Sequence, residues 1–499
     1  MLTRVLLVSC AVLLLAQAPA YGDVGVVLNE SLDTGGDRIS STGHSAVYLS
    51  RVCAETPVKL RMCRPGEAGS VLSTYTGFGE TQPFEWNVVP LGVFLYGAED
   101  PRGWTLVGSA KIKRALEEHY RENHLSPYCS GPPCTTSDKA DWRDMVGAGL
   151  SRNIYIFVVE TTVEQDRELV EKLNSLPNEN HFNAVTRNCA DFTRSVIRIY
   201  FPHATSPDYL NDFGMSTPKA MARSFTRYAL RHPEMKFHVL HFSQVPGTIK
   251  RSRKVRDATE QLYRSKLFPV PIVLFAVYAL PAAAVSYELT GRFNPDREWE
   301  KHPTVQAAEI TGEIRAVEGE KDKARIKQLE AAERRERARV LGTAEDWKAY
   351  RKELDLMVAE AVRQRIIPDR NSLHRVFKEL DKTGTPSLDA GGELWMEVSA
   401  GGETSKVGLS ASNILSPGSD TLLAYRVILA RIDRMLNSPK HSRETLLVFK
   451  KNWALLEAAR RKNALSVASG AGPATSGHAA GMPTHAPGMA PGGSARGSD

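Results

Sequence analysis

The sequence predicts an α+β protein with a hydrophobic membrane segment and a mainly α-helical C-terminal region. Short β-branched runs alternate with helical ones from residue 23 to about residue 245. An uncharged stretch at residues 267–287 is long enough to cross a bilayer. Residues 304–365 are dense in charges of both signs and have a helical period. With 499 residues, the chain is long enough for two or three domains.

The first twenty residues are typical of a secretory signal peptide. Arg4 precedes an apolar run at residues 5–16, and Ala18-Pro19-Ala20 fits a small-x-small cleavage site. A lipoprotein cleavage box ending at Cys10 is an alternative, but the apolar run continues beyond that cysteine. The sequence therefore predicts export, with the first half of the chain facing the periplasm.

Removal of the signal peptide leaves five cysteines, an odd number. The sequence predicts disulfides between Cys53 and Cys63 and between Cys129 and Cys134, because each pair closes a short loop. Zinc is the alternative use of these four cysteines, although the usual CxxC spacing is absent. Either way, Cys189 is left over.

The first half of the chain, residues 22–245, contains strand-like and helical segments in alternation. Strands are bounded runs of β-branched residues, and helices have one apolar face and a cap or a proline at an end. The first two strands are expected to form a hairpin bridged by the first disulfide. The predicted strands are 45–52, 58–62, 153–163 and 236–245, and the predicted helices are 164–176, 188–200 and 217–231.

The second half begins with a basic linker at residues 246–266, which precedes the predicted membrane segment. Much of the net charge of +7 lies here, as seven Lys and Arg residues between 250 and 266. The positive-inside rule would place this flank in the cytoplasm, whereas the signal peptide places it outside. Either the segment lies in the membrane interface with its basic flank on anionic lipid headgroups, or export decides the topology and the charge rule fails. We favour export, because the cysteine count also indicates an oxidising compartment.

The remainder of the second half is expected to be a mainly helical domain at residues 288–464 and a disordered tail at residues 465–499. A short hairpin is expected at residues 394–412, where glycines mark the turns, and helices at 420–436 and 443–461. The tail is composed largely of Gly, Ala, Pro, Ser and Met and carries almost no charge, which is typical of disorder.

Cys189 stands at the start of a predicted amphipathic helix, and this position favours a reactive thiol. The helix dipole and the unbonded amides of a first turn lower a thiol pKa and can receive an oxyanion. Asn188 is a candidate oxyanion donor, and Asp191 is expected to cap the first turn. A nucleophile needs a base, and His44 at the head of a predicted strand is the best candidate, although His238 or His241 could replace it.

Two motifs carry a resemblance to a known family: GHSAVYL at residues 43–49 and NCADF at residues 188–192. In that order, with a strand and a helix before the second, they resemble the motifs of circularly permuted papain-like thiol hydrolases. This group includes lecithin retinol acyltransferase-like proteins and relatives of the NlpC-type cell-wall peptidases. The resemblance covers residues 22–245 and implies a permuted papain-like fold with Cys189 as nucleophile and His44 as general base.

The resemblance also implies a third polar residue, on the following strand, that orients the imidazole. That strand offers Lys59 and Arg61, which cannot accept a proton from the imidazole. Glu55 in the connecting turn is the candidate that we choose, since Asp37 precedes the motif. Without an acceptor, the domain would be a degenerate binding module.

These observations predict an envelope-localised cysteine hydrolase or acyltransferase that acts on an amide or ester through an acyl-cysteine intermediate. The substrate could be a peptidoglycan peptide, a protein or a lipid. A non-catalytic, membrane-anchored envelope scaffold is one alternative, and an intracellular protein with an uncleaved anchor is another. Membrane lipid is the expected partner, and no cofactor or metal is expected. Nucleic acid is not expected either, because the basic run lacks the interleaved aromatic residues of a nucleic-acid-binding surface. The oligomeric state stays open.

Overall fold

The structure is a computed structural model, and it describes about half of the chain. The described residues are 22–32, 43–74, 84–127, 145–260, 285, 287, 292–302, 323–341, 384–400 and 403–410, with short gaps inside 84–127 and 145–260. The signal peptide, the second predicted disulfide, the helices predicted after residue 420 and the tail lie outside these residues.

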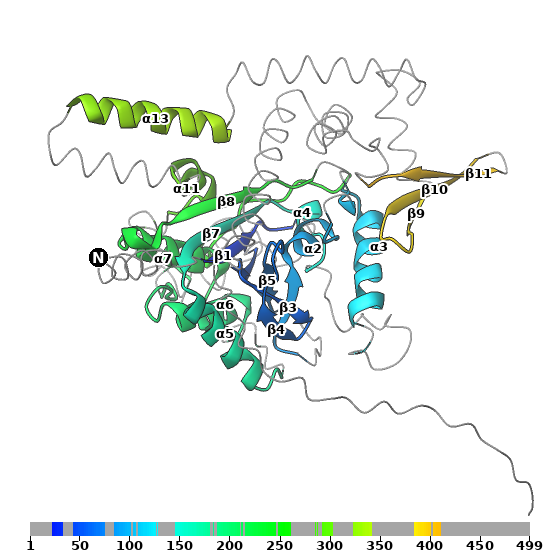
Figure 1. The fold of residues 1–499 in the computed structure, drawn as a ribbon, viewed down its shortest axis with the longest axis horizontal. Coiled ribbons are helices and arrows are strands. Elements are labelled where there is room, and N and C mark those ends of the chain that lie inside the picture. Colours follow the sequence, from blue (N-terminus) through cyan, green and yellow to red (C-terminus); the bar gives the residue numbers. More distant parts are fainter. Residues whose placement is uncertain are drawn as a thin grey trace, which may run out of the picture.

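A six-stranded sheet forms the centre of the first half (Figure 1). The strand order is β6-β5-β2-β1-β7-β8, and each neighbouring pair is antiparallel. The long strand predicted at residues 153–163 is confirmed as β7, beside β1 in the middle of the sheet. The strands are β1 (Gly22–Asn29), β2 (His44–Leu49), β5 (Ser70–Ser73), β6 (Asn87–Pro90), β7 (Ile154–Thr161) and β8 (His238–Phe242).

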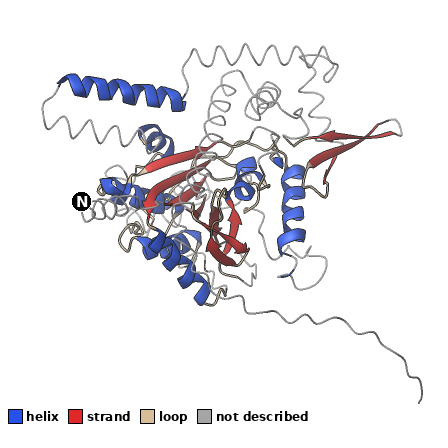
Figure 2. Ribbon diagram, in the orientation of Figure 1, coloured by secondary structure: helices blue, strands red, loops and turns tan. Residues whose placement is uncertain are grey.

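Helices cover both faces of this sheet (Figure 2). Because side chains alternate along a strand, Val27 and Ala46 pack into one apolar cluster, and Val26 and Val47 into another. The first cluster includes residues of α2 (Leu91–Tyr96), α3 (Ala110–Tyr120) and α4 (Ala148–Ser151). The second includes residues of α5 (Val163–Ser175), α6 (Cys189–Tyr200) and α7 (Pro218–Leu230).

The starts of α5, α6 and α7 confirm the predicted helices. Thr162, Asn188 and Thr217 are the N-caps, and each side chain accepts a hydrogen bond from a first-turn amide. Such caps satisfy donors that the helix itself leaves unbonded. The sequence therefore located these helix starts to within a residue or two.

The predicted hairpin between residues 45–52 and 58–62 has a different first strand. β2 ends at Leu49, and the chain bends so that the Ser50 amide donates to the Asp23 carbonyl oxygen at 2.9 Å. A separate strand, β3 (Val52–Thr56), then pairs with β4 (Lys59–Met62) as a two-stranded unit outside the central sheet. In the central sheet, β2 pairs with β5, and not with the strand at residues 58–62 that the sequence predicted.

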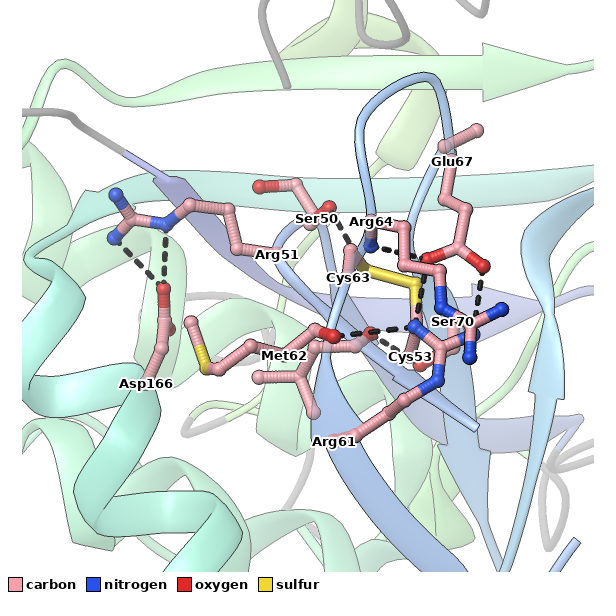
Figure 3. The surroundings of a disulfide bond; sticks show 12 residues. Ser50, Arg51, Cys53, Arg61, Met62, Cys63, Arg64, Glu67, Ser70 and Asp166 are labelled. Carbon is pink, nitrogen blue, oxygen red and sulfur yellow. Dashed lines mark hydrogen bonds and ion pairs between the residues drawn. A yellow bond between two sulfur atoms is a disulfide. The ribbon is translucent and has the colours of Figure 1, made fainter. Parts of the chain in front are cut away.

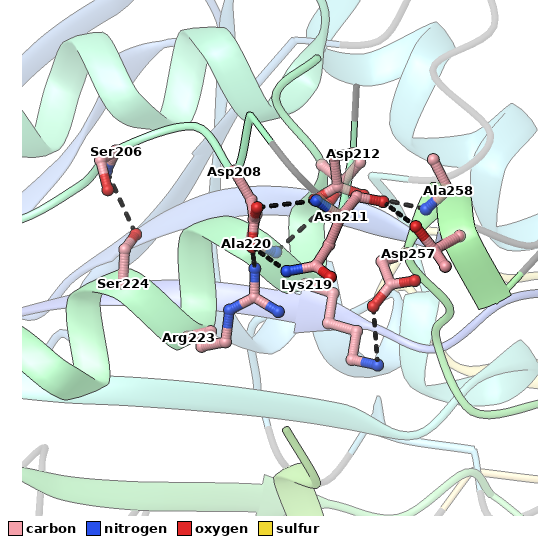
Figure 4. Close-up of polar contacts among 12 residues, drawn as sticks. Ser206, Asp208, Asn211, Asp212, Lys219, Ala220, Arg223, Ser224, Asp257 and Ala258 are labelled. Carbon is pink, nitrogen blue, oxygen red and sulfur yellow. Dashed lines mark hydrogen bonds and ion pairs between the residues drawn. The ribbon is translucent and has the colours of Figure 1, made fainter. Parts of the chain in front are cut away.

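A cluster of ion pairs and hydrogen bonds joins α7 and the residues before it to residues 257–260, which follow β8 along the chain (Figure 4). Lys219 Nζ lies 3.4 Å from Asp257 Oδ2 and 2.8 Å from Glu260 Oε2. Asp212 accepts from the Ala258 amide at 2.9 Å, and burial raises the pKa of this carboxyl group to about 6. The beginning of the basic linker therefore packs against the first domain.

The predicted fold class, which included a membrane segment, is contradicted. Among the described residues, no helix has both the length and the apolar composition needed to cross a bilayer. The membrane segment predicted at residues 267–287 lies almost wholly outside the described residues. The described residues form a mixed α/β protein with a large antiparallel sheet.

The region predicted to be mainly helical, residues 288–464, is described only in part. Its described residues include the charged helix α13 (Lys323–Leu341) and α11 (Pro295–Lys301), which contacts β8. They also include a three-stranded antiparallel sheet in the order β11-β10-β9. The expected hairpin is present as β10 (Leu394–Ala400) and β11 (Glu403–Gly408), but β9 (Thr385–Leu388) adds a third strand, in which Pro386 lies at the edge of the sheet.

Candidate active site

Cys189 is the first residue of α6, and a capping box fixes its position. Asn188 Oδ1 accepts from the amides of Ala190 at 2.8 Å and Asp191 at 3.1 Å. Asn188 Nδ2 donates to the Ser216 carbonyl oxygen at 3.1 Å, and Asp191 accepts from the Asn188 amide. Asn188 therefore holds the helix start, and its side chain is committed to this cap rather than to an oxyanion. Asp191 caps the turn as predicted.

Cys189 is half-buried as a residue, and its thiol combines desolvation with backbone donors. Burial raises the pKa of the thiol, and the Asp191 carboxylate adds to that effect. The backbone amides of Ser45, Ala190 and Cys189 itself lower the pKa, but they do not offset the burial. The predicted lowering of the pKa is therefore wrong: the resting thiol is neutral, and three amides converge on it where a developing thiolate or oxyanion would need them.

The contact with Ser45 places the thiol at the end of β2. The Ser45 hydroxyl donates to Thr193 Oγ1 at 2.9 Å, so this side chain faces α6, one turn along from Cys189. Strand amides point sideways, in the plane of the sheet. The thiol that the Ser45 amide reaches therefore lies near this plane, beside the chain at His44–Ser45.

His44 begins β2, and Gly43 sets its position. Gly43 has a φ of 72°, in the left-handed region that glycine favours. A Cβ atom at this residue would lie 2.4 Å from the Asn29 carbonyl oxygen and 2.4 Å from Val255 Cγ1. The glycine of the GH motif is thus explained by backbone conformation and close packing.

Ser73 of β5 holds the His44 imidazole. Since Ser45 faces α6, strand alternation places His44 on the other face of the sheet, where its Nε2 lies 2.8 Å from Ser73 Oγ. Where the Ser73 hydroxyl group donates to the Thr74 carbonyl oxygen, 3.5 Å away, its oxygen is the acceptor for Nε2–H. In this tautomer, Nδ1 is the basic nitrogen of the ring.

The sequence missed Ser73 as the polar residue that orients the imidazole. The search covered the strand that follows His44 along the chain, whereas Ser73 comes from the strand that lies beside β2 in the sheet. The sequence signal that could have indicated this strand was the short run Ser70–Ser73, which has two apolar residues between two serines.

Glu55 lies away from His44. It belongs to β3 and pairs with Lys59, with Oε2 2.9 Å from Nζ, and both side chains are about half exposed. It lines a pocket of about 750 Å³ that also includes Gly69 and Pro90. Those two residues mark the end of β5 and β6 opposite to Ser73, so Glu55 cannot orient the imidazole.

The disulfide between Cys53 and Cys63 is present and closes the β3–β4 unit, as predicted (Figure 3). Beside it, Glu67 makes a two-pronged ion pair with Arg61 at 2.7 and 2.8 Å. Glu67 lies close enough to both sulfur atoms for the three residues to resemble a metal site. The sulfur atoms are joined to each other, so they are not available as thiolate ligands.

The two alternative histidines belong to β8, which β1 and β7 separate from β2. His241 stacks on Tyr155 with ring centroids 4.4 Å apart, and Trp299 packs against its edge. His238 Nδ1 lies 3.2 Å from the Lys236 carbonyl oxygen. Both histidines therefore make packing or backbone contacts on a strand away from Cys189, and neither replaces His44.

Of the predicted catalytic residues, the structure brings Cys189 and the start of β2 together. It uses Asn188 as a cap and places Glu55 elsewhere. The amide of Ser45 and the hydroxyl group of Ser73 complete the surroundings of the thiol and the imidazole. No family model matches the chain, and neither a curated protein nor a solved structure matches it.

Proposed function

We propose that residues 22–245 form a cysteine hydrolase or acyltransferase that cleaves an amide or ester through an acyl-cysteine intermediate. Cys189 is the nucleophile, His44 the general base, and Ser73 the residue that orients His44. One observation carries the proposal: the backbone amide of Ser45, the residue after His44, reaches the thiol at the first residue of α6, and His44 Nε2 is held by Ser73. The motifs shared with permuted thiol hydrolases add support.

In the proposed reaction, the thiol proton passes to His44 Nδ1 as the sulfur attacks the carbonyl carbon. The carbonyl oxygen takes the electron pair and faces the converging amides. The bond from carbon to nitrogen or oxygen then breaks, and the imidazolium returns its proton to the leaving group. Water, or another acceptor in a transferase, attacks the thioester, releases the acyl group and restores the thiol.

A neutral resting thiol fits this scheme. With a pKa above its ordinary value, the sulfur loses its proton only when the base accepts it, so His44 has to act in the same step as the attack. The thiol is also protected from unspecific oxidation and alkylation, because these require the thiolate.

Export is part of the proposal. The apolar N-terminal run followed by a small-x-small site supports secretion. The Cys53–Cys63 disulfide supports an oxidising compartment, because reducing compartments keep thiols apart. An envelope substrate such as a peptidoglycan peptide, a protein or an acylated lipid is consistent with that location.

One observation favours a second function, that of a binding domain without catalysis. Burial outweighs three amide donors at Cys189 and leaves the thiol protonated, as in cysteines that serve only for packing. In such a domain, His44 and Ser73 would be a structural hydrogen-bonded pair.

Turnover of two small substrates separates the two functions. The substrates are p-nitrophenyl acetate and an N-acetylated peptide p-nitroanilide, and the proteins are the full chain and its Cys189→Ala, His44→Ala and His241→Ala variants. The proposal predicts that the first two variants lose roughly 100-fold or more in kcat/KM. His241 is buried on β8, which two intervening strands separate from β2, so His241→Ala should stay within about twofold. Equal turnover in wild type and Cys189→Ala would refute the proposal, and turnover no faster than the uncatalysed reaction in both would favour the binding domain.

A further inference from the structure

Four polar side chains form a row across one end of the central sheet. They come from adjacent strands: Asn29 from β1, His44 from β2, Ser73 from β5 and Asn87 from β6. Asn29 lies opposite His44, and Ser73 lies opposite Asn87. The contact between His44 and Ser73 joins the two pairs. We call these four residues the polar row.

The polar row faces one side of the sheet. Side chains two positions apart on a strand point to the same face. On each of the four strands, the residue two positions from the member of the row, toward the middle of that strand, is apolar. All four of these apolar residues belong to one buried cluster. They are Val27, Ala46, Val71 and Val89.

The two asparagines of the row are buried without hydrogen-bond partners. Asn29 is 0% exposed and Asn87 is 1% exposed. Within the described part of the chain, neither the side-chain oxygen nor the side-chain nitrogen of either residue has a partner. Buried amides are nearly always paired in folded proteins, so two such orphans beside one catalytic candidate call for a ligand.

We infer that Asn29 and Asn87 bind backbone amides of an extended peptide substrate. This inference rests on the proposed function and narrows its substrate class. A carboxamide has two donor hydrogens and an acceptor oxygen, and a peptide group supplies the matching carbonyl oxygen and N–H. An ester supplies acceptors only, and it would leave both asparagine oxygens buried and unsatisfied. The polar row therefore selects a peptide over an acyl ester.

The spacing of the two asparagines sets the length of the peptide. β1 and β6 are three strand spacings apart, which is about 14 Å. An extended peptide spans this distance with about four residues. Asn29, beside His44, meets the amide at the bond that is cleaved, and Asn87 meets an amide about four residues further along.

The test uses N-acetylated peptide p-nitroanilides of one to five residues and the matching p-nitrophenyl esters. The full chain is compared with its Asn29→Leu and Asn87→Leu variants, which replace each carboxamide by an apolar group of similar size. In the wild type, kcat/KM for the anilides should rise with length up to about four residues. Asn87→Leu should abolish this rise. Asn29→Leu should lower kcat/KM for the anilides roughly 10-fold, with at most a threefold change for the esters.

Thermal unfolding supplies the second readout. A buried carboxamide without hydrogen-bond partners destabilises the free protein. Each leucine variant removes one such group and should therefore raise Tm by roughly 2–4 °C. Thr226→Val is the matched control, since Thr226 on α7 is also buried and its hydroxyl group has no partner in the described part of the chain. It should raise Tm without altering the ratio of anilide to ester turnover.

Three results would overturn the inference: no dependence on peptide length in the wild type, equal losses on anilides and esters, or a lower Tm in both leucine variants. The first two leave the proposed function standing, provided that turnover still requires Cys189. Turnover that persists in Cys189→Ala refutes the proposed function itself, whatever the asparagine variants do.

Discussion

Ser73 Oγ lies 2.8 Å from His44 Nε2, so the imidazole is held by a strand that begins 26 residues after it along the chain. The serine therefore holds the ring at Nε2, and in the proposed reaction Nδ1 is the nitrogen that accepts the thiol proton. Without this contact, the imidazole could rotate about its side-chain bonds and exchange tautomers.

Ser73→Ala should lower kcat/KM roughly 10- to 100-fold, because a misoriented base accepts the thiol proton less often. The loss should appear in kcat rather than in KM. Ser70→Ala is the matched control: Ser70 lies on the same strand and donates to the Val52 carbonyl oxygen at 2.6 Å, at the opposite end from His44. A similar loss of kcat in both variants would mean that the effect comes from the strand and not from the imidazole.

Gly43→Ala should lower the free energy of unfolding by roughly 2–4 kcal/mol, because it combines a left-handed φ with a clash against the Asn29 carbonyl oxygen. Chemical denaturation measures this loss. Gly66→Ala tests the cause, since Gly66 has a φ of 85° but no atom near the position of the added methyl group. It should cost only about 1–2 kcal/mol, and equal costs would rule out the clash.

Stability should fall as the pH rises from about 4 to 7, in proportion to the ionisation of Asp212. Burial raises the pKa of Asp212 to about 6 in the folded state, so the folded protein binds this proton more tightly than the unfolded chain does. The contribution is at most about 3 kcal/mol. Denaturant titrations at several pH values should show a smaller slope for Asp212→Asn than for wild type; identical slopes would contradict this assignment.

Replacing both cysteines of the β3–β4 disulfide by serine should lower the free energy of unfolding by roughly 2–3 kcal/mol, because the bridge closes a loop between residues ten positions apart. Denaturation with and without dithiothreitol measures it. The double variant should no longer respond to the reductant through this pair. Full stability of the double variant would show that the hairpin holds without the bridge.

The sequence predicted what depends on neighbouring residues. The capping residues Thr162, Asn188 and Thr217 located three helices, and the β-branched run predicted β7, because caps and strand propensity act within a few residues. Cys189 and His44 were chosen as candidates in the same way, from a helix start and a strand start.

What the sequence could not predict depends on which strands become neighbours. Glu55 was chosen because it follows His44 along the chain, but its strand belongs to the separate two-stranded unit. Ser73 reaches the imidazole only because β5 pairs with β2, and strand pairing over such a distance leaves no local pattern. The raised thiol pKa has a similar origin, since helix position alone favours lowering and the burial that opposes it comes from tertiary packing.

The most direct test of the central claim is the mass of the intact protein during a rapid-quench reaction with p-nitrophenyl acetate, followed by peptide mapping. The account predicts one acetyl group per chain, located on Cys189. Formation of this adduct should be at least 100-fold slower in His44→Ala and absent in Cys189→Ala. Acetylation spread over lysines, or an adduct on Cys189 that forms at the wild-type rate without His44, would contradict the assignment of a thiol nucleophile and its imidazole base.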